Sequence, residues 1–212
     1  RAYLDALHVN PSKLSRVEDI PFLPIKFFKT HTVQSGVFEP KAVFESSGTS
    51  RTINSRHPVK DIHLYEESFI KGFEHFYGLV SDYCILGLLP AYLERTGSSL
   101  VYMVDKMIKL SNHPQSGFYL NEYEKLFEAL KQLENKGQKI LLIGVSFALL
   151  DFFEKYPMNL KNTIVMETGG MKGRRREMIR PELHAELSIG SGVAKIHSEY
   201  GMTELLSQAY SK

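Results

Sequence analysis

The fold is decided by residues 139–166, KILLIGVSFALLDFFEKYPMNLKNTIVM. The run Ile140 to Val145 is short and almost entirely apolar, which is typical of a strand buried on both faces. Ser146 is placed to cap a helix over 147–156, and a second buried strand is expected over 163–166. Strand, helix and strand in this order predict a βαβ unit with parallel strands and a right-handed crossover.

The same alternation continues on both sides of this unit. A short strand over 42–44 is expected to lead through a loop into a helix over 64–79, and another buried strand is expected over 83–89. Further helices are expected to begin at Gly97-Ser98-Ser99, at Asn121 as N-cap, and at Pro181 in a first turn; Val193 to Ser198 is expected to be the last strand. The predicted fold class is α/β, with a mainly parallel sheet flanked by helices and ligands at the carboxyl ends of its strands.

Length and composition favour one principal domain. The chain has 212 residues, of which 43% are apolar and 24% charged, and this is ordinary for a globular protein. Residues 1–40 contain Pro11, Pro21 and Pro24 and are expected to form a lead-in segment of short helical and extended stretches. Residues 41–212 are expected to form the α/β core.

Charge and cysteine content exclude several classes of function. A net charge of +2 is too small to indicate a nucleic-acid partner, so the basic cluster 172–176 is interpreted as a local anion site. The single cysteine, Cys84, lies within an apolar strand pattern, where a structural role is expected. No apolar run reaches the roughly 20 residues that span a bilayer, and the expected location is cytoplasmic.

Three loops that follow predicted strands carry the unusual residues. In a parallel sheet the carboxyl ends of the strands meet at one edge, so these loops are expected to converge on a nucleotide. The first loop offers small hydroxyl side chains and backbone N–H groups that can wrap phosphate oxygens: Ser46, Ser47, Gly48, Thr49 and Ser50. It is not a Walker A loop, and it lacks a lysine, so Arg51, Arg56 or His57 would neutralise phosphate charge; a flexible surface loop is the alternative.

The third loop is expected over Glu199 to Glu204, and its residues Tyr200-Gly201-Met202-Thr203-Glu204 match the Tyr-Gly-x-Thr-Glu element of the adenylate-forming superfamily. The resemblance implies that Tyr200 stacks on adenine, that Thr203 meets the α-phosphate and that Glu204 binds Mg²⁺. Each role is physically sound, since a flat ring suits a base, Gly201 allows close approach of the backbone, and a carboxylate beside phosphates needs a cation between them.

The middle loop, 167–174, narrows the resemblance. Together with 140–146 and the Pro21-Phe-Leu-Pro24 segment it resembles the LuxE-type acyl-protein synthetases, the long-chain-fatty-acid–protein ligases of bacterial luminescence, over Pro21 to Lys212. The resemblance implies that Gly169 and Gly170 lie against adenine or ribose and that Lys172 or Arg174 lies near phosphate or the reacting carboxylate. The catalytic residues expected are therefore Thr203, Glu204 and Lys172, which the resemblance implies, and His57, which could replace the missing lysine.

The function implied is ATP- and Mg²⁺-dependent activation of a carboxylic acid, expected to be a long-chain fatty acid, as an acyl-adenylate. Acyl transfer to a thiol follows, on a protein cysteine or coenzyme A, with an acyl-CoA reductase as an implied partner. Members of the family continue into a small C-terminal domain. The chain, which starts at Arg1 and ends at Lys212, is therefore expected to be a partial N-terminal adenylation domain that binds nucleotide weakly and does not complete the reaction.

Three other functions stay open. An acid–CoA ligase of the phenylacetate–CoA-ligase-like group shares much of the pattern, and a non-catalytic nucleotide-binding module would explain the missing loop lysine. The segment 144–148, Gly-Val-Ser-Phe-Ala, imitates the nucleophile elbow of α/β-hydrolases, with His184 or His197 as the partner of Ser146.

The segment 190–195 imitates a dinucleotide fingerprint, but it precedes a strand and is interpreted as a turn. The eight histidines have no zinc-ligand spacing.

Overall fold

The computed structural model describes residues 2–46, 53–89, 97–171 and 173–212. Its centre is a six-stranded sheet in the order β4-β3-β5-β6-β7-β8. Strands β3 to β7 are parallel, and β8 runs antiparallel to β7. The strands are β3 (Cys84–Leu88), β4 (Gly117–Phe118), β5 (Ile140–Gly144), β6 (Thr163–Glu167), β7 (His197–Gly201) and β8 (Gln208–Ser211). The fold is therefore α/β with a mainly parallel sheet, as the sequence predicts.

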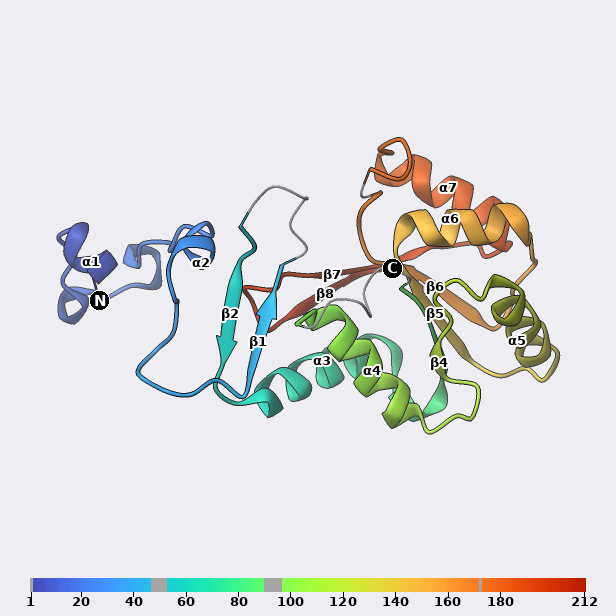
Figure 1. Cartoon of the computed structure of the whole chain (residues 1–212), viewed down its shortest axis with the longest axis horizontal. Helices are drawn as coiled ribbons and strands as arrows, with labels where there is room; N and C mark the ends of the chain where they lie inside the picture. Colours follow the sequence, from blue (N-terminus) through green and yellow to red (C-terminus); the bar gives the residue numbers. More distant parts are fainter. Residues whose placement is uncertain (1, 47–52, 90–96, 172) are drawn as a thin grey trace.

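Helices cover both faces of this sheet (Figure 1). One face carries α3 (Ile62–Tyr77) and α4 (Ser99–Ser111), and the other carries α5 (Tyr123–Asn135), α6 (Ser146–Lys155) and α7 (Arg180–Ser191). Every residue of β3 and β5 is buried, because helices pack on both sides of these strands. A 3-10 turn, η3 (Val80–Asp82), joins α3 to β3.

Two helix starts differ from the prediction. Ser146 is the first residue of α6 and Val145 is the N-cap, without a side-chain cap; the Ser146 hydroxyl donates instead to the Glu167 carboxylate (3.1 Å). The N-cap of α5 is Glu122 rather than Asn121, again without a side-chain cap. The predictions for α4 and α7 are confirmed: Ser98 caps α4, and a proline occupies the first turn of α7.

The strand expected over 42–44 exists but does not belong to the main sheet. It is β1 (Ala42–Glu45), which pairs antiparallel with β2 (Arg56–Val59) in a separate two-stranded sheet. The first hydroxyl-rich loop therefore joins two strands of this small sheet rather than a parallel strand to a helix, and the expectation that it opens on the parallel edge is wrong. Before it, the lead-in segment forms short pieces as expected: α1 (Ala2–Ala6), η1 (Pro11–Lys13), η2 (Val17–Asp19) and α2 (Phe27–Thr30).

The C-terminal part also differs in detail. The strand expected over 193–198 begins later, at His197, and continues through the Tyr-Gly pair to Gly201. Gly190 was expected in a turn but lies inside α7. A Cβ added to this glycine would lie 2.7 Å from the Cβ of Phe153 in α6. Gly192, with φ of 76°, ends α7 in the left-handed conformation, which glycine adopts without steric cost.

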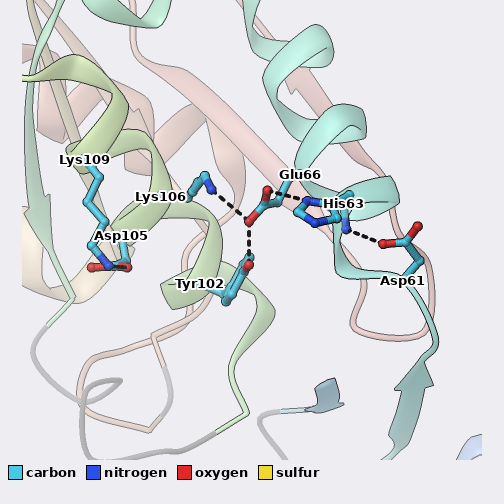
Figure 2. Close-up of polar contacts among 7 residues, drawn as sticks. All are labelled: Asp61, His63, Glu66, Tyr102, Asp105, Lys106 and Lys109. Carbon is cyan, nitrogen blue, oxygen red and sulfur yellow. Dashed lines mark hydrogen bonds and ion pairs between the residues drawn. The ribbon is translucent and has the colours of Figure 1, made fainter. Parts of the chain in front are cut away.

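A polar cluster fixes α3 against α4 (Figure 2). The Glu66 carboxylate, whose side chain is 13% exposed, accepts a hydrogen bond from the Tyr102 hydroxyl (2.6 Å) and contacts the Lys106 ammonium (3.0 Å). His63, one turn earlier on α3, lies 3.3 Å from the same carboxylate. The hydrogen bond from Tyr102, followed by those from Lys106 and His63, lowers the pKa of Glu66. The cluster sets the position of α3, which also contacts the candidate site.

Candidate functional site

The site is organised around the turn that joins β7 to β8, residues 202–207, called here the β7–β8 turn. An internal bond from Leu205 N to the Met202 carbonyl (3.0 Å) closes it. The Ser68 hydroxyl of α3 donates to the Leu206 carbonyl (2.9 Å), and His57 Nδ1 of β2 donates to the Thr203 carbonyl (2.9 Å). Two segments far away in the sequence therefore hold the turn, which carries two of the predicted site residues, Thr203 and Glu204.

His57 also connects the turn to the hydroxyl-rich loop. Ser46 N donates to the Ser55 carbonyl (3.0 Å), and Ser55 N donates to the Ser46 hydroxyl (2.9 Å), so these two residues close the loop at its base. Ser55, just before β2, stands two residues from His57, which is about 7 Å at a strand rise of about 3.3 Å per residue. Ser47, Gly48, Thr49 and Ser50 lie outside the described residues. The base of the loop is thus beside the β7–β8 turn, although its strands are not part of the main sheet.

Within the predicted element, Tyr200 and Glu204 have accessible positions. The Tyr200 side chain is 60% exposed at the end of β7, so its ring is available for stacking. Thr203 and Glu204 are partly exposed in the turn. Gly201 has a further role: a Cβ there would lie 2.9 Å from Oε1 of Glu199. A side chain at position 201 would therefore be too close to the Glu199 carboxyl. This packing explains the glycine without a nucleotide beside it.

The middle loop leaves β6 beside β7. Its glycines have positive φ angles, 49° for Gly169 and 81° for Gly170, and this conformation alone favours glycine at both positions. Gly169 N donates to Oε2 of Glu167 (3.0 Å), which anchors the start of the loop. Lys172 lies outside the described residues.

The basic cluster is largely neutralised by carboxylates. Arg175 bonds Asp151 (2.7 Å) and, through both terminal nitrogens, Glu154 (2.6 Å each). Arg176 pairs with a carboxylate of α7, Glu182. Arg174 is exposed and lies over the Phe147 ring, 4.9 Å from its centroid, at the start of α6. Within the described part of this cluster, Arg174 is therefore the cation best placed to meet an anion. Arg56, considered as a lysine substitute, pairs with Glu45 (3.3 Å).

A buried acid to which the sequence pattern assigns no role, Glu199, stands at the centre of this edge. Glu199 is 5% exposed, and its Oε2 accepts a hydrogen bond from the Thr168 hydroxyl (2.7 Å). Burial raises the pKa of Glu199 to about 7, the hydrogen bond from Thr168 opposes this, and the neighbouring Glu167 charge adds to it. The residues around Glu199 gave no local signal of this burial, because the groups that bury the acid come from other parts of the chain, among them Thr168.

Ser146, Glu167 and His184 do meet, but in an order that does not suit a nucleophilic serine. The Ser146 hydroxyl donates to Oε2 of Glu167, and His184 Nε2 lies 3.6 Å from Oε1 of the same carboxylate and 3.3 Å from the Ser198 hydroxyl. The acid stands between serine and histidine, whereas a triad needs the histidine between them. His197 contacts the Tyr77 hydroxyl instead (3.2 Å).

The described residues contain no group of three histidine, cysteine, aspartate or glutamate side chains placed to hold a metal ion. Magnesium often binds through one carboxylate, phosphates and water, and Glu204 in its accessible turn fits such a role. Over the same part of the chain, no helix has the length and apolar character needed to cross a membrane.

Comparison with protein-family models, with curated proteins and with solved structures gives no match for this chain.

Proposed function

We propose that this protein uses ATP to activate a carboxylic acid as an acyl-adenylate, as its resemblance to LuxE-type synthetases implies. The observation that supports this most is the bond from His57 to the Thr203 carbonyl. It brings the base of the hydroxyl-rich loop to the turn that carries the Thr-Glu pair, although 146 residues separate the bonded partners.

The proposed reaction requires two anions to meet at the α-phosphorus of ATP. A carboxylate oxygen of the acid attacks the α-phosphorus of ATP, and the bond from that phosphorus to the pyrophosphate oxygen breaks. Both reactants are anions, so neutralising charge and fixing an in-line geometry provide most of the catalysis. Tyr200 would hold the adenine by stacking, and Glu204 would hold a Mg²⁺ ion that neutralises phosphate charge. Arg174 is an accessible cation for the acid or the phosphates.

The second half of the reaction transfers the acyl group to a thiol, on a protein cysteine or on coenzyme A. Cys84 is not suited to this step. It lies fully buried in β3, and burial raises the pKa of its thiol to about 11, so the nucleophilic thiolate is scarce near neutral pH. We propose that the acceptor thiol is supplied from outside the residues described here, and that a long-chain fatty acid is the substrate.

The test is ATP–pyrophosphate exchange by the full protein with Mg²⁺ and a panel of acids, from short-chain to long-chain fatty acids together with phenylacetate. Exchange that depends on a fatty acid is the expected result, and preference for phenylacetate would favour an acid–CoA ligase instead. Absence of exchange with every acid would reject the adenylation proposal. Direct binding of ATP without exchange would identify a nucleotide-binding module.

Two variants test whether Glu204 takes part in the exchange reaction. Glu204→Gln keeps the shape of the side chain and removes the charge that would hold Mg²⁺, so exchange is expected to fall about 100-fold, which corresponds to about 3 kcal/mol of lost transition-state stabilisation. The matched control is Glu124→Gln, an exposed acid on α5, for which unchanged exchange is expected. Equal activity of the two variants would remove Glu204 from the site.

A further inference from the structure

Glu167, the last residue of β6, brings groups from α6, α7, β7 and the middle loop together around one carboxyl group. It is 6% exposed. Its Oε2 accepts hydrogen bonds from the Ser146 hydroxyl at the start of α6 (3.1 Å) and from Gly169 N of the middle loop (3.0 Å). Its Oε1 lies 3.6 Å from Nε2 of His184 in α7, and that nitrogen lies 3.3 Å from the Ser198 hydroxyl of β7. Hydrogen bonds in such a buried network are strong, so the carboxyl group can hold these segments together.

The middle loop needs an anchor because it contains two glycines in succession. Gly169 and Gly170 are exposed, and both have positive φ angles. Glycine loses more conformational freedom on ordering than any other residue, so an ordered pair of glycines needs restraint from its neighbours. Thr168 and Met171, on either side of the pair, are buried, and the hydrogen bond to Glu167 fixes the first glycine itself. The exposed backbone of the pair is thereby held in one conformation.

The same carboxyl group also fixes the start of α6. Ser146, which donates to it, is the first residue of this helix. The next residue, Phe147, is buried, and the exposed Arg174 lies over its ring. Glu167 is therefore bonded both to the glycine pair and to the helix start that supports the accessible cation of this edge.

We propose that Glu167 is a positioning residue for nucleotide binding. Its carboxyl group holds the middle loop against the start of α6, so that the Gly169-Gly170 backbone is ordered as a support for the base or ribose of ATP. This inference rests on the proposed function. Without the carboxyl group, the Gly169 amide and the Ser146 hydroxyl lose their acceptor and the loop adopts other conformations. The apparent affinity for ATP then falls with the fraction of molecules whose loop is correctly placed.

The test compares two replacements of Glu167 in the full protein. Glu167→Met has nearly the same length and no strong acceptor, whereas Glu167→Gln can keep an oxygen in the place of Oε2. In ATP–pyrophosphate exchange, Glu167→Met is expected to raise the KM for ATP about tenfold. The KM for pyrophosphate, which does not involve the base, and kcat are expected to change less than about twofold. Glu167→Gln is expected to restore most of the affinity for ATP.

A second measurement uses no nucleotide. Hydrogen exchange at the Gly169 amide is expected to be up to about tenfold faster in Glu167→Met and close to the wild-type rate in Glu167→Gln. Ser146→Ala, which removes the other donor to Oε2, is expected to have a smaller effect of the same kind, about threefold on both the hydrogen exchange of Gly169 and the KM for ATP. It should add nothing in the Glu167→Met background. The exposed-acid control, Glu124→Gln on α5, is expected to change neither measurement.

The outcomes separate anchoring of the loop, nucleotide binding and general damage to the fold. Wild-type hydrogen exchange at Gly169 in Glu167→Met would overturn the proposal, and so would an unchanged KM for ATP. A fall in kcat with both KM values unchanged would indicate only a smaller amount of active protein, and would also overturn it. If Glu167→Met does not fold, Ser146→Ala decides in the same way.

The proposed function can fail separately. If the wild-type protein neither binds ATP nor catalyses pyrophosphate exchange, the proposed function is rejected, together with the role of Glu167 in nucleotide binding. Hydrogen exchange at Gly169 would still decide whether Glu167 holds the loop.

Discussion

At the scale of single residues, the Tyr-Gly-Met-Thr-Glu element places accessible side chains next to a buried acid. It contains Tyr200, which is exposed at the end of β7, and Thr203 and Glu204, which are partly exposed in the β7–β8 turn. The residue just before it, Glu199, could not be identified from one sequence, because its burial depends on Thr168, which follows β6, and on β8. Contacts between strands that are distant in sequence leave little local signal.

Gly201→Ala tests the packing of this acid. The new methyl group would meet Oε1 of Glu199, whose carboxyl group Thr168 holds through Oε2. A loss of about 1–3 kcal/mol in the free energy of unfolding is therefore expected, as for overpacked cores. Chemical denaturation measures it. Gly117→Ala is the control, because nothing lies within 4 Å of its Cβ position. In a Glu199→Ala background the cost of Gly201→Ala should largely vanish; a cost that persists would contradict the contact.

At the scale of elements, the regular part of the chain was predictable and the irregular part was not. Buried strands such as β3 and β5 can be recognised in the sequence as continuous apolar runs. In contrast, β2 reads Arg-His-Pro-Val and β8 reads Gln-Ala-Tyr-Ser, and neither pattern indicates a strand. Proline is tolerated in a strand when its missing N–H falls at an edge, and β2 belongs to a sheet of only two strands.

Two glycines inside helices should respond to alanine in opposite directions. Glycine is less favourable than alanine in a helix by roughly 1 kcal/mol. At Gly72 of α3 the nearest atom to a new Cβ is 3.9 Å away, whereas at Gly190 of α7 the Phe153 Cβ is 2.7 Å away. Gly72→Ala is therefore expected to stabilise by about 0.5–1 kcal/mol, and Gly190→Ala to destabilise by about 1–3 kcal/mol. Thermal or urea unfolding compares them; a stabilising Gly190→Ala would mean that α6 and α7 are not closely packed.

The link between α3 and α4 should depend on pH. Because the pKa of Glu66 is lowered in the folded protein, its contribution is present above the unfolded value of 4.5 and is lost as pH falls through the lowered folded value. Glu66→Gln is expected to cost about 1–3 kcal/mol at pH 7 and less at acidic pH. Glu67→Gln, which breaks a pair with Lys71 in which both side chains are well exposed, should cost little at any pH. Denaturant midpoints from pH 3 to 7 separate the two, and parallel curves would contradict the assignment.

At the scale of the whole molecule, the alternation of strands and helices predicted the sheet, but not how the small β1–β2 sheet meets it. The first loop was expected to follow a strand of the parallel sheet, and this is wrong, since β1 belongs to the separate two-stranded sheet. The loop base nevertheless lies near the β7–β8 turn because β2 presents His57 to Thr203. The ring of Phe28 packs edge-on against His57 at 5.6 Å, so the lead-in segment supports the same contact.

His57→Ala should therefore loosen the small sheet from the β7–β8 turn without unfolding the main sheet. One hydrogen bond is worth about 0.5–1.5 kcal/mol, so hydrogen exchange is expected to accelerate several-fold in 53–59 and 203–207 and to stay unchanged in β5. If the proposed function holds, ATP affinity should fall in parallel. His57→Asn, whose amide can donate from nearly the position of Nδ1, should restore protection of the turn. His75→Ala, an exposed histidine on α3, is the control. Unchanged exchange at 203–207 in His57→Ala would show that the turn holds its place without β2, and the strongest structural support for a shared nucleotide site would be lost.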